Sequence, residues 1–223
     1  MISLPRISQL LQQNFQRNGF AVVPDALNQE LTRRWRQWAE RLKTNALTIK
    51  RAHGDFQLVY RVVPGEVIRE QWPELFAFYE DPATLQWIRD MTRETAVCTS
   101  SSLRSAINLN IMESTDSVYR WHFDAVPYTL LLYLNDVVPE DGGAMQLVPQ
   151  CKPQVQPDLS QARIVDLWPK AGTCILMDGT RCYHRVSRLL RPTTRLSIPL
   201  VYPNSKAAQR PMGLDDYLYK ESA

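Results

Sequence analysis

The first 95 residues alternate between apolar and polar positions mostly with the period of a helix. Apolar side chains recur every three or four positions over residues 6–17 and 28–43, which predicts two amphipathic helices. Short apolar runs bounded by turn-forming residues predict strands over residues 20–23 and 56–63. Residues 66–95 again follow a helical pattern, which prolines interrupt. We interpret the apolar stripes of these helices as core rather than as a cofactor site.

From residue 97 onward the pattern changes to short strands separated by turns. Ile107, Leu109 and Ile111 alternate with Asn108 and Asn110, which predicts a strand with one apolar and one polar face. Further strands are expected at residues 118–123, 128–134, 144–148, 163–167, 172–177 and 195–202. Short strands at this spacing are typical of a sandwich or jelly roll, and unlike a series of βαβ units.

Length and composition narrow the class of protein. A chain of 223 residues is expected to form one domain, with residues 1–95 as a helical support region containing a few strands and residues 97–203 as a strand-rich core. The net charge of +3, from 26 basic and 23 acidic residues, is too balanced to predict a nucleic-acid or membrane partner. We expect a monomer or homodimer.

The cysteines and the N-terminus indicate the compartment. The 4 cysteines form no CxxC pair, and the N-terminal residues lack the pattern of a signal peptide. No apolar run approaches the roughly 18 residues that span a bilayer. We therefore expect a soluble cytoplasmic protein with reduced thiols.

One stretch carries candidate metal chemistry. His122 and Asp124 are two positions apart, so on an extended strand both side chains leave the same face. A second histidine would complete a 2-His-1-carboxylate facial triad, which suits non-haem Fe(II) with open coordination positions. The chain offers only His53 and His184 for this role. We favour His184, which follows an apolar strand and a turn, and interpret His53 as a solvated loop residue.

A candidate anion site lies 11 residues beyond His184. Arg195 and Ser197 share a face of the strand at residues 195–202 by the same two-residue period. A guanidinium and a hydroxyl inside an otherwise apolar strand form a suitable receptor for a carboxylate, which accepts two charge-assisted hydrogen bonds from arginine. The sequence thus predicts a metal triad with a carboxylate anchor beside it.

At this point the segment from His122 to Val201 resembles the core of the Fe(II)/2-oxoglutarate-dependent dioxygenases. Their pattern is His-X-Asp, a distal His, then Arg-X-Ser. The runs at residues 129–136 and 142–149 are also similar to that family, and residues 18–27 resemble the opening of its phytanoyl-CoA-hydroxylase-like and prolyl-hydroxylase-like branch. The resemblance covers most of the chain beyond residue 18 but leaves residues 45–95 unmatched. The motifs are specific in combination, not singly.

The resemblance implies a fold and a set of functional residues. It implies an α+β, mainly β fold, a double-stranded β-helix (jelly roll, cupin-like) with the N-terminal helices packed on it. His122, Asp124 and His184 would bind Fe(II), while Arg195 and Ser197 would bind the far carboxylate of 2-oxoglutarate. Asn110 is a further candidate contact for 2-oxoglutarate. The loop before Arg195 is about one residue longer than usual, which leaves Arg191 as an alternative anchor.

The implied reaction is oxidative decarboxylation of 2-oxoglutarate by O2, with release of succinate and CO2 and hydroxylation of an unactivated C–H bond; ascorbate is expected to assist. Related halogenases have a small residue in place of the carboxylate, so Asp124 favours hydroxylation over halogenation. Nucleic-acid demethylases usually carry a second arginine where this chain has Val201. We expect a small-molecule substrate, such as an amino acid or natural-product intermediate, with Arg61 as a guessed contact.

Other functions stay open at this level. A protein or peptide hydroxylase of the prolyl-hydroxylase type has similar strands. A cupin-like metal-binding protein without catalytic turnover is a further alternative, against which the intact triad and anchor count. Desaturation is also a possible outcome of the same chemistry.

Overall fold

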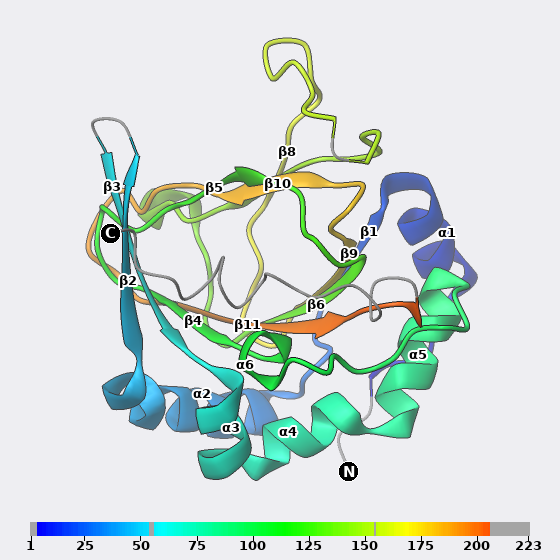
Figure 1. Cartoon of the computed structure of the whole chain (residues 1–223), viewed down its shortest axis with the longest axis horizontal. Coiled ribbons are helices and arrows are strands. Elements are labelled where there is room, and N and C mark those ends of the chain that lie inside the picture. Colours follow the sequence, from blue (N-terminus) through cyan, green and yellow to red (C-terminus); the bar gives the residue numbers. More distant parts are fainter. Residues whose placement is uncertain (1–3, 54–55, 154, 206–223) are drawn as a thin grey trace.

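The structure is a computed structural model, and it describes residues 4–53, 56–153 and 155–205. Figure 1 shows three layers: a group of helices, a large sheet in the middle and a smaller sheet on the far side of it. The two sheets face each other, and both consist of antiparallel strand pairs in the described residues. This arrangement agrees with the expected jelly roll.

The large sheet has seven strands in the order β1-β9-β6-β11-β4-β3-β2. Their bounds are β1 Phe20–Val23, β2 Leu47–His53, β3 Phe56–Val63, β4 Leu109–Met112, β6 Tyr128–Tyr133, β9 Cys174–Asp178 and β11 Arg195–Tyr202. Three of these strands come from the region expected to be a helical support, so that region also builds both edges of the sheet. β6, β11 and β4 are neighbours in the middle of this sheet, and the pairing between them sets the positions of several candidate site residues.

The small sheet has four strands in the order β5-β10-β7-β8. Their bounds are β5 Tyr119–His122, β7 Met145–Val148, β8 Val165–Leu167 and β10 Tyr183–Val186. β5 is an edge strand and pairs only with β10, with an irregular register between them. The segment between β7 and β8 extends away from both sheets (Figure 1).

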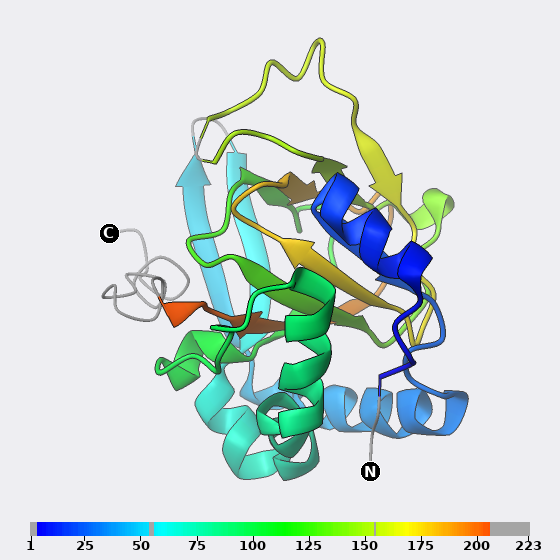
Figure 2. The same ribbon diagram turned by 90° about the vertical axis from the view of Figure 1, so that its right-hand side faces the viewer.

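The helices, most of them from the first hundred residues, cover the outer face and one end of the large sheet (Figures 1 and 2). Their bounds are α1 Gln9–Asn18, α2 Gln29–Leu42, α3 Gly65–Gln71, α4 Pro73–Glu80, α5 Pro82–Thr92 and α6 Leu103–Ala106, with short 3-10 helices at Lys43–Asn45 and Pro139–Asp141. Side chains of Ser8 and Asn28 accept hydrogen bonds from main-chain N–H groups in the first turns of α1 and α2, which stabilises those helix starts. None of the described helices is long and apolar enough to cross a membrane.

Most of the predicted elements are confirmed, and three elements of the structure were not predicted. β1 and β3 have the predicted bounds, and the helices lie within two or three residues of theirs. His184 follows a strand and a turn as expected, but it lies on a further strand, β10, that was not predicted. The segment at residues 47–53 was given no strand, although β2 pairs along its whole length with β3. Residues 103–106 form α6 before β4 begins.

The large sheet has an apolar face and a mixed face. Side chains on the face toward the helices, such as Leu109, Leu130 and Leu196, are fully buried in the main hydrophobic core. Their neighbours in sequence point between the two sheets, as the two-residue period of a strand requires. The space between the sheets is therefore lined by the alternate residues of β4, β6 and β11.

Candidate active site

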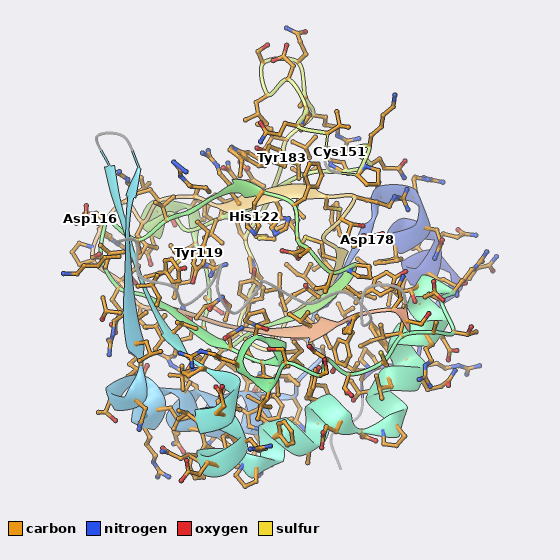
Figure 3. All side chains as sticks on the ribbon, in the orientation of Figure 1. Asp116, Tyr119, His122, Cys151, Asp178 and Tyr183 are labelled. Atoms are coloured by element: carbon orange, nitrogen blue, oxygen red, sulfur yellow. The ribbon has the colours of Figure 1, made fainter. Side chains whose placement is uncertain are left out.

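The small sheet brings three candidate metal ligands together. His122 ends β5, His184 lies on β10, and the two residues are direct partners in the register of the small sheet. Asp124 follows β5, and its Oδ1 lies 3.5 Å from Nε2 of each histidine. The candidate ligand atoms of all three residues lie within 4.8 Å of one another. Figure 3 places His122 between the two sheets, where a bound ion would be enclosed.

Main-chain contacts orient both imidazole rings. Nδ1 of His122 lies 2.7 Å from the carbonyl oxygen of Arg120, and Nδ1 of His184 lies 2.8 Å from that of Cys182. A carbonyl oxygen only accepts, so each Nδ1 must carry the proton and donate it. The tautomer that follows leaves the lone pair of each Nε2 directed at the common centre, which is the arrangement a metal ligand requires.

The electrostatics of the three residues favour an ionised carboxylate. Burial by itself disfavours the charge of Asp124, but the neighbouring His184 and His122 outweigh it and hold the pKa of Asp124 well below its usual range. Burial likewise disfavours a charged His122, whereas hydrogen bonding to Asp124 raises the pKa of His122 above its usual value. Two nitrogens and one carboxylate oxygen, clustered and partly shielded from water, form a donor set that fits Fe(II).

The candidate carboxylate anchor is built around a buried guanidinium. Arg195 is 3% exposed, and its Nε donates to the carbonyl oxygen of Gly143 at 3.0 Å. Its two terminal nitrogens donate to the hydroxyls of Ser197 at 3.0 Å and Tyr133 at 3.2 Å. Within the described part of the chain, no carboxylate forms an ion pair with Arg195. A buried cation with only neutral partners is a strong receptor for an anionic ligand.

Of the three other residues predicted for the site, one lines the cavity and two are not among the described residues that line it. Asn110 lines the same cavity and is the direct register partner of Ser197 on the adjacent strand. Arg191 is well exposed and pairs with Asp141, so the alternative anchor is not supported. Arg61 pairs with Glu113 at 2.6 Å and is not among the described residues that line the cavity, so these observations do not support it as a substrate contact.

A cavity of about 300 Å³ joins the metal cluster and the anchor. It lies between the two sheets, and beyond the predicted residues it is lined by Thr129, Tyr133, Tyr60 and Tyr119 among others. The rings of Tyr60 and Tyr119 lie 4.8 Å apart and form an aromatic wall. The pattern within residues 128–134 could have identified Thr129 and Tyr133, because they are the polar members of the face that they share with Leu131. The two wall tyrosines carry no such pattern.

Comparisons with known proteins support this description of the fold. The family model described as Halogenase D matches residues 5–218. The epimerase SnoN, solved in complex with Fe3+, alpha ketoglutarate and nogalamycin RO, is 19% identical over 96% of this chain and 91% of its own, with a TM-score of 0.75.

Two further solved structures agree. HygX from Streptomyces hygroscopicus, with nickel, 2-oxoglutarate and hygromycin B bound, is 16% identical over 89% of this chain and 88% of its own, with a TM-score of 0.68. A Pseudomonas putida prolyl-4-hydroxylase is 17% identical over 87% of this chain and 97% of its own, with a TM-score of 0.58. No curated protein matches this chain. The expected jelly-roll fold and the resemblance to Fe(II)/2-oxoglutarate oxygenases are confirmed.

Proposed function

Since this chain belongs to the Halogenase D family and has the fold of the Fe(II)/2-oxoglutarate-dependent oxygenases, we propose that it hydroxylates an unactivated C–H bond of a small molecule, such as an amino acid or a natural-product intermediate. The enzyme class follows from the family, the fold and the His-Asp-His group. The specific reaction is our proposal.

The carboxylate of Asp124 is the observation that carries this proposal. In halogenases of this type a small residue at that position leaves room for a halide on the metal. Here that position holds a carboxylate, whose Oδ1 lies 3.5 Å from both histidine Nε2 atoms. Therefore, although the family is named for halogenases, we propose that this member inserts a hydroxyl group and not a halogen atom.

We assign His122, Asp124 and His184 as the metal ligands, and Arg195, Ser197 and Asn110 as the residues that bind 2-oxoglutarate. When bound, iron with 2-oxoglutarate and O2 supplies the oxidising chemistry, in which one oxygen atom enters succinate and the other enters the substrate. The protein's part is to fix two neutral imidazoles and one carboxylate at the right positions before the co-substrate arrives.

The anchor residues have the protonation states that the role requires. Burial raises the pKa of Tyr133 above its usual value, although the nearby Arg195 opposes this effect, so the phenol keeps its proton at neutral pH. Its oxygen accepts from Arg195, which leaves the hydroxyl hydrogen available for a ligand. The hydroxyl oxygen of Ser197 also accepts a hydrogen bond from Arg195, so its hydrogen is likewise available for a ligand. One guanidinium and two hydroxyls thus face the position of a carboxylate in a water-poor cavity.

The cavity favours a small substrate. Its volume of about 300 Å³ is at the lower end of ligand pockets, and 2-oxoglutarate must occupy part of it. The wall of Tyr60 and Tyr119 that lines this cavity suits an aliphatic or planar portion of the substrate. A peptide-hydroxylase function is supported only by the fold. We retain as proposals the single domain over residues 1–223, the cytoplasmic location, the monomeric or dimeric state and the absence of nucleic-acid and membrane partners.

The test is succinate production from 2-oxoglutarate by the purified protein with Fe(II) and ascorbate, followed by a substrate screen in buffer with chloride. We expect His122→Ala to abolish succinate formation and Arg195→Ala to raise the KM for 2-oxoglutarate strongly. Arg163→Ala, which removes the same charge from an exposed position, is the matched control and should behave like the wild type. A substrate product that carries chlorine, or a wild type that binds no 2-oxoglutarate, would refute the proposal.

A further inference from the structure

The two oxygens of Asp124 have different surroundings. Oδ1 is the oxygen that faces Nε2 of both histidines. Oδ2 accepts a hydrogen bond of 3.1 Å from the hydroxyl of Thr129. A hydroxyl bound to an ionised carboxylate donates its proton, so this contact engages Oδ2 while Oδ1 faces the histidines.

Thr129 is placed for this contact by the large sheet. It lies on β6, between Met177 of β9 and Val201 of β11 in the register, and is 4% exposed. Its side chain therefore faces the cavity, on the same side as Leu131. A buried hydroxyl requires a hydrogen-bond partner, and Asp124 provides an acceptor for it.

Gly179 packs against the same carboxylate, closest to the same oxygen Oδ2. A Cβ atom on this residue would lie 2.1 Å from Oδ2 and 2.5 Å from Cγ of Asp124, distances that no side chain tolerates. Gly179 is absent from the described residues with positive φ, so its backbone does not itself require glycine. The glycine is required by the space that the Asp124 carboxylate occupies.

Main-chain hydrogen bonds keep these groups in contact. The N–H of Asp124 donates to the carbonyl oxygen of Gly179 at 2.9 Å, and the N–H of Gly179 donates to that of Pro127 at 2.7 Å. The segment after β5 and the turn after β9 are thereby tied together beside the carboxylate. Thr129 and Gly179 consequently form a cradle, with Thr129 contributed by β6 and Gly179 by the turn after β9.

We propose that Thr129 and Gly179 are positioning residues that make Asp124 a ligand through one oxygen only. The inference rests on the proposed metal site and deepens it. A carboxylate can bind a cation through one or both oxygens. With Oδ2 held by Thr129 and packed on Gly179, only Oδ1 is presented, and one more coordination position stays free for co-substrate and oxygen.

The first test compares Thr129→Val with Thr129→Ser. Valine has nearly the same shape but cannot donate, and serine restores the hydroxyl. We expect Thr129→Val to weaken Co(II) binding by about 10- to 100-fold, as is typical of residues that orient metal ligands. The visible spectrum of the bound Co(II) should also change because both carboxylate oxygens become available. Thr129→Ser should restore both readouts. Thr92→Val, which removes a buried hydroxyl bonded to Ile88 in α5, is the control.

Unchanged Co(II) affinity and spectrum in a folded Thr129→Val protein would overturn the role of Thr129. The same conclusion would follow if Thr92→Val weakened Co(II) binding equally, because the effect would then reflect general loss of stability.

The second test is a thermodynamic cycle on the metal-free protein. Gly179→Ala should lower Tm by about 2–12 °C in the wild type, since overpacking a tight site has a cost of this size. In an Asp124→Gly background the added methyl enters vacated space, and the penalty should disappear. An equal penalty in both backgrounds would show that the turn, not the carboxylate, requires glycine. This cycle needs no metal, so a protein that bound no Co(II) would refute the proposed function separately from the cradle.

Discussion

The two faces of the large sheet are built from the same strands and have opposite compositions. On β11, Leu196 and Ile198 face the helices and are fully buried in the apolar core, whereas Arg195 and Ser197 face the small sheet. On β6 the same division separates Leu130 from Thr129. Figure 1 shows why: one face is covered by helices, and the other looks across to the second sheet.

This difference shows that one face of the large sheet mainly stabilises the fold and the other carries the residues of the candidate site. The helix-facing residues gain free energy from burial of apolar surface, so any change of volume there should be felt in unfolding. The cavity-facing residues instead bury a guanidinium among neutral partners and place a carboxylate beside two histidines, so this face buries charged groups that can bind ligands. Because successive strand residues point to opposite faces, neighbours in sequence can serve different purposes.

The largest expected contrast is between Arg195 and its neighbour Leu196. Arg195→Met should lower affinity for 2-oxoglutarate by at least about 30-fold, since truncating a buried charged partner costs roughly 2–5 kcal/mol. The free energy of unfolding without ligand should change by less than about 1 kcal/mol, because the burial of charge that is removed offsets the lost hydrogen bonds. Calorimetric titration and urea unfolding measure the two quantities.

Leu196→Ala should show the opposite behaviour. Removing a side chain that is 0% exposed is expected to lower the free energy of unfolding by about 2–5 kcal/mol. The folded fraction should bind 2-oxoglutarate with wild-type affinity. If Leu196→Ala weakened binding as much as Arg195→Met, the two faces would not be separable.

A smaller effect is expected for the hydroxyl of Ser197. Ser197→Ala removes one neutral hydrogen-bond partner of Arg195 and of the carboxylate, worth about 0.5–1.5 kcal/mol. We expect a KM for 2-oxoglutarate raised by roughly 2- to 10-fold with little change in kcat. Succinate release at varied 2-oxoglutarate measures this, and a large loss of kcat at saturation would place Ser197 in the chemistry instead.

The smallest effect should come from an ion pair outside both faces. Burial by itself would raise the pKa of Glu113, but Lys43 and Arg61 outweigh it and lower this pKa. The stabilising contribution is therefore present above about pH 4.5 and is lost as the pH falls through the lowered value. Since these side chains are partly exposed, Glu113→Gln should cost less than about 1 kcal/mol at neutral pH.

Urea unfolding of this variant and the wild type at neutral and acid pH tests the sign. The two free energies of unfolding should converge in acid, while KM for 2-oxoglutarate stays unchanged throughout. If the difference between the two free energies of unfolding grew as the pH fell, the lowered pKa assigned to Glu113 would be contradicted.

Local pattern was sufficient for much of the fold and for the candidate ligands. The two-residue period of strands placed His122 with Asp124 and Arg195 with Ser197, because both pairs lie within one short segment. It also predicted the polar face of Asn108 and Asn110, which line the cavity. Local pattern failed where a short strand has no apolar repeat of its own. β10 carries Tyr, His, Arg and Val in succession, and β2 alternates weakly, so only their pairing partners make them strands.

What the sequence determined by itself is the chemistry of the site: which side chains could bind a metal and which could bind a carboxylate, since these properties belong to residue types and short spacings. Only the tertiary structure decided how they meet. The register that opposes His184 to His122, the hydroxyl of Thr129 beside Oδ2 of Asp124 and the missing Cβ of Gly179 join segments about 5 to 60 residues apart. Such contacts depend on strand register within the small sheet and on how the two sheets pack together, which no local period encodes.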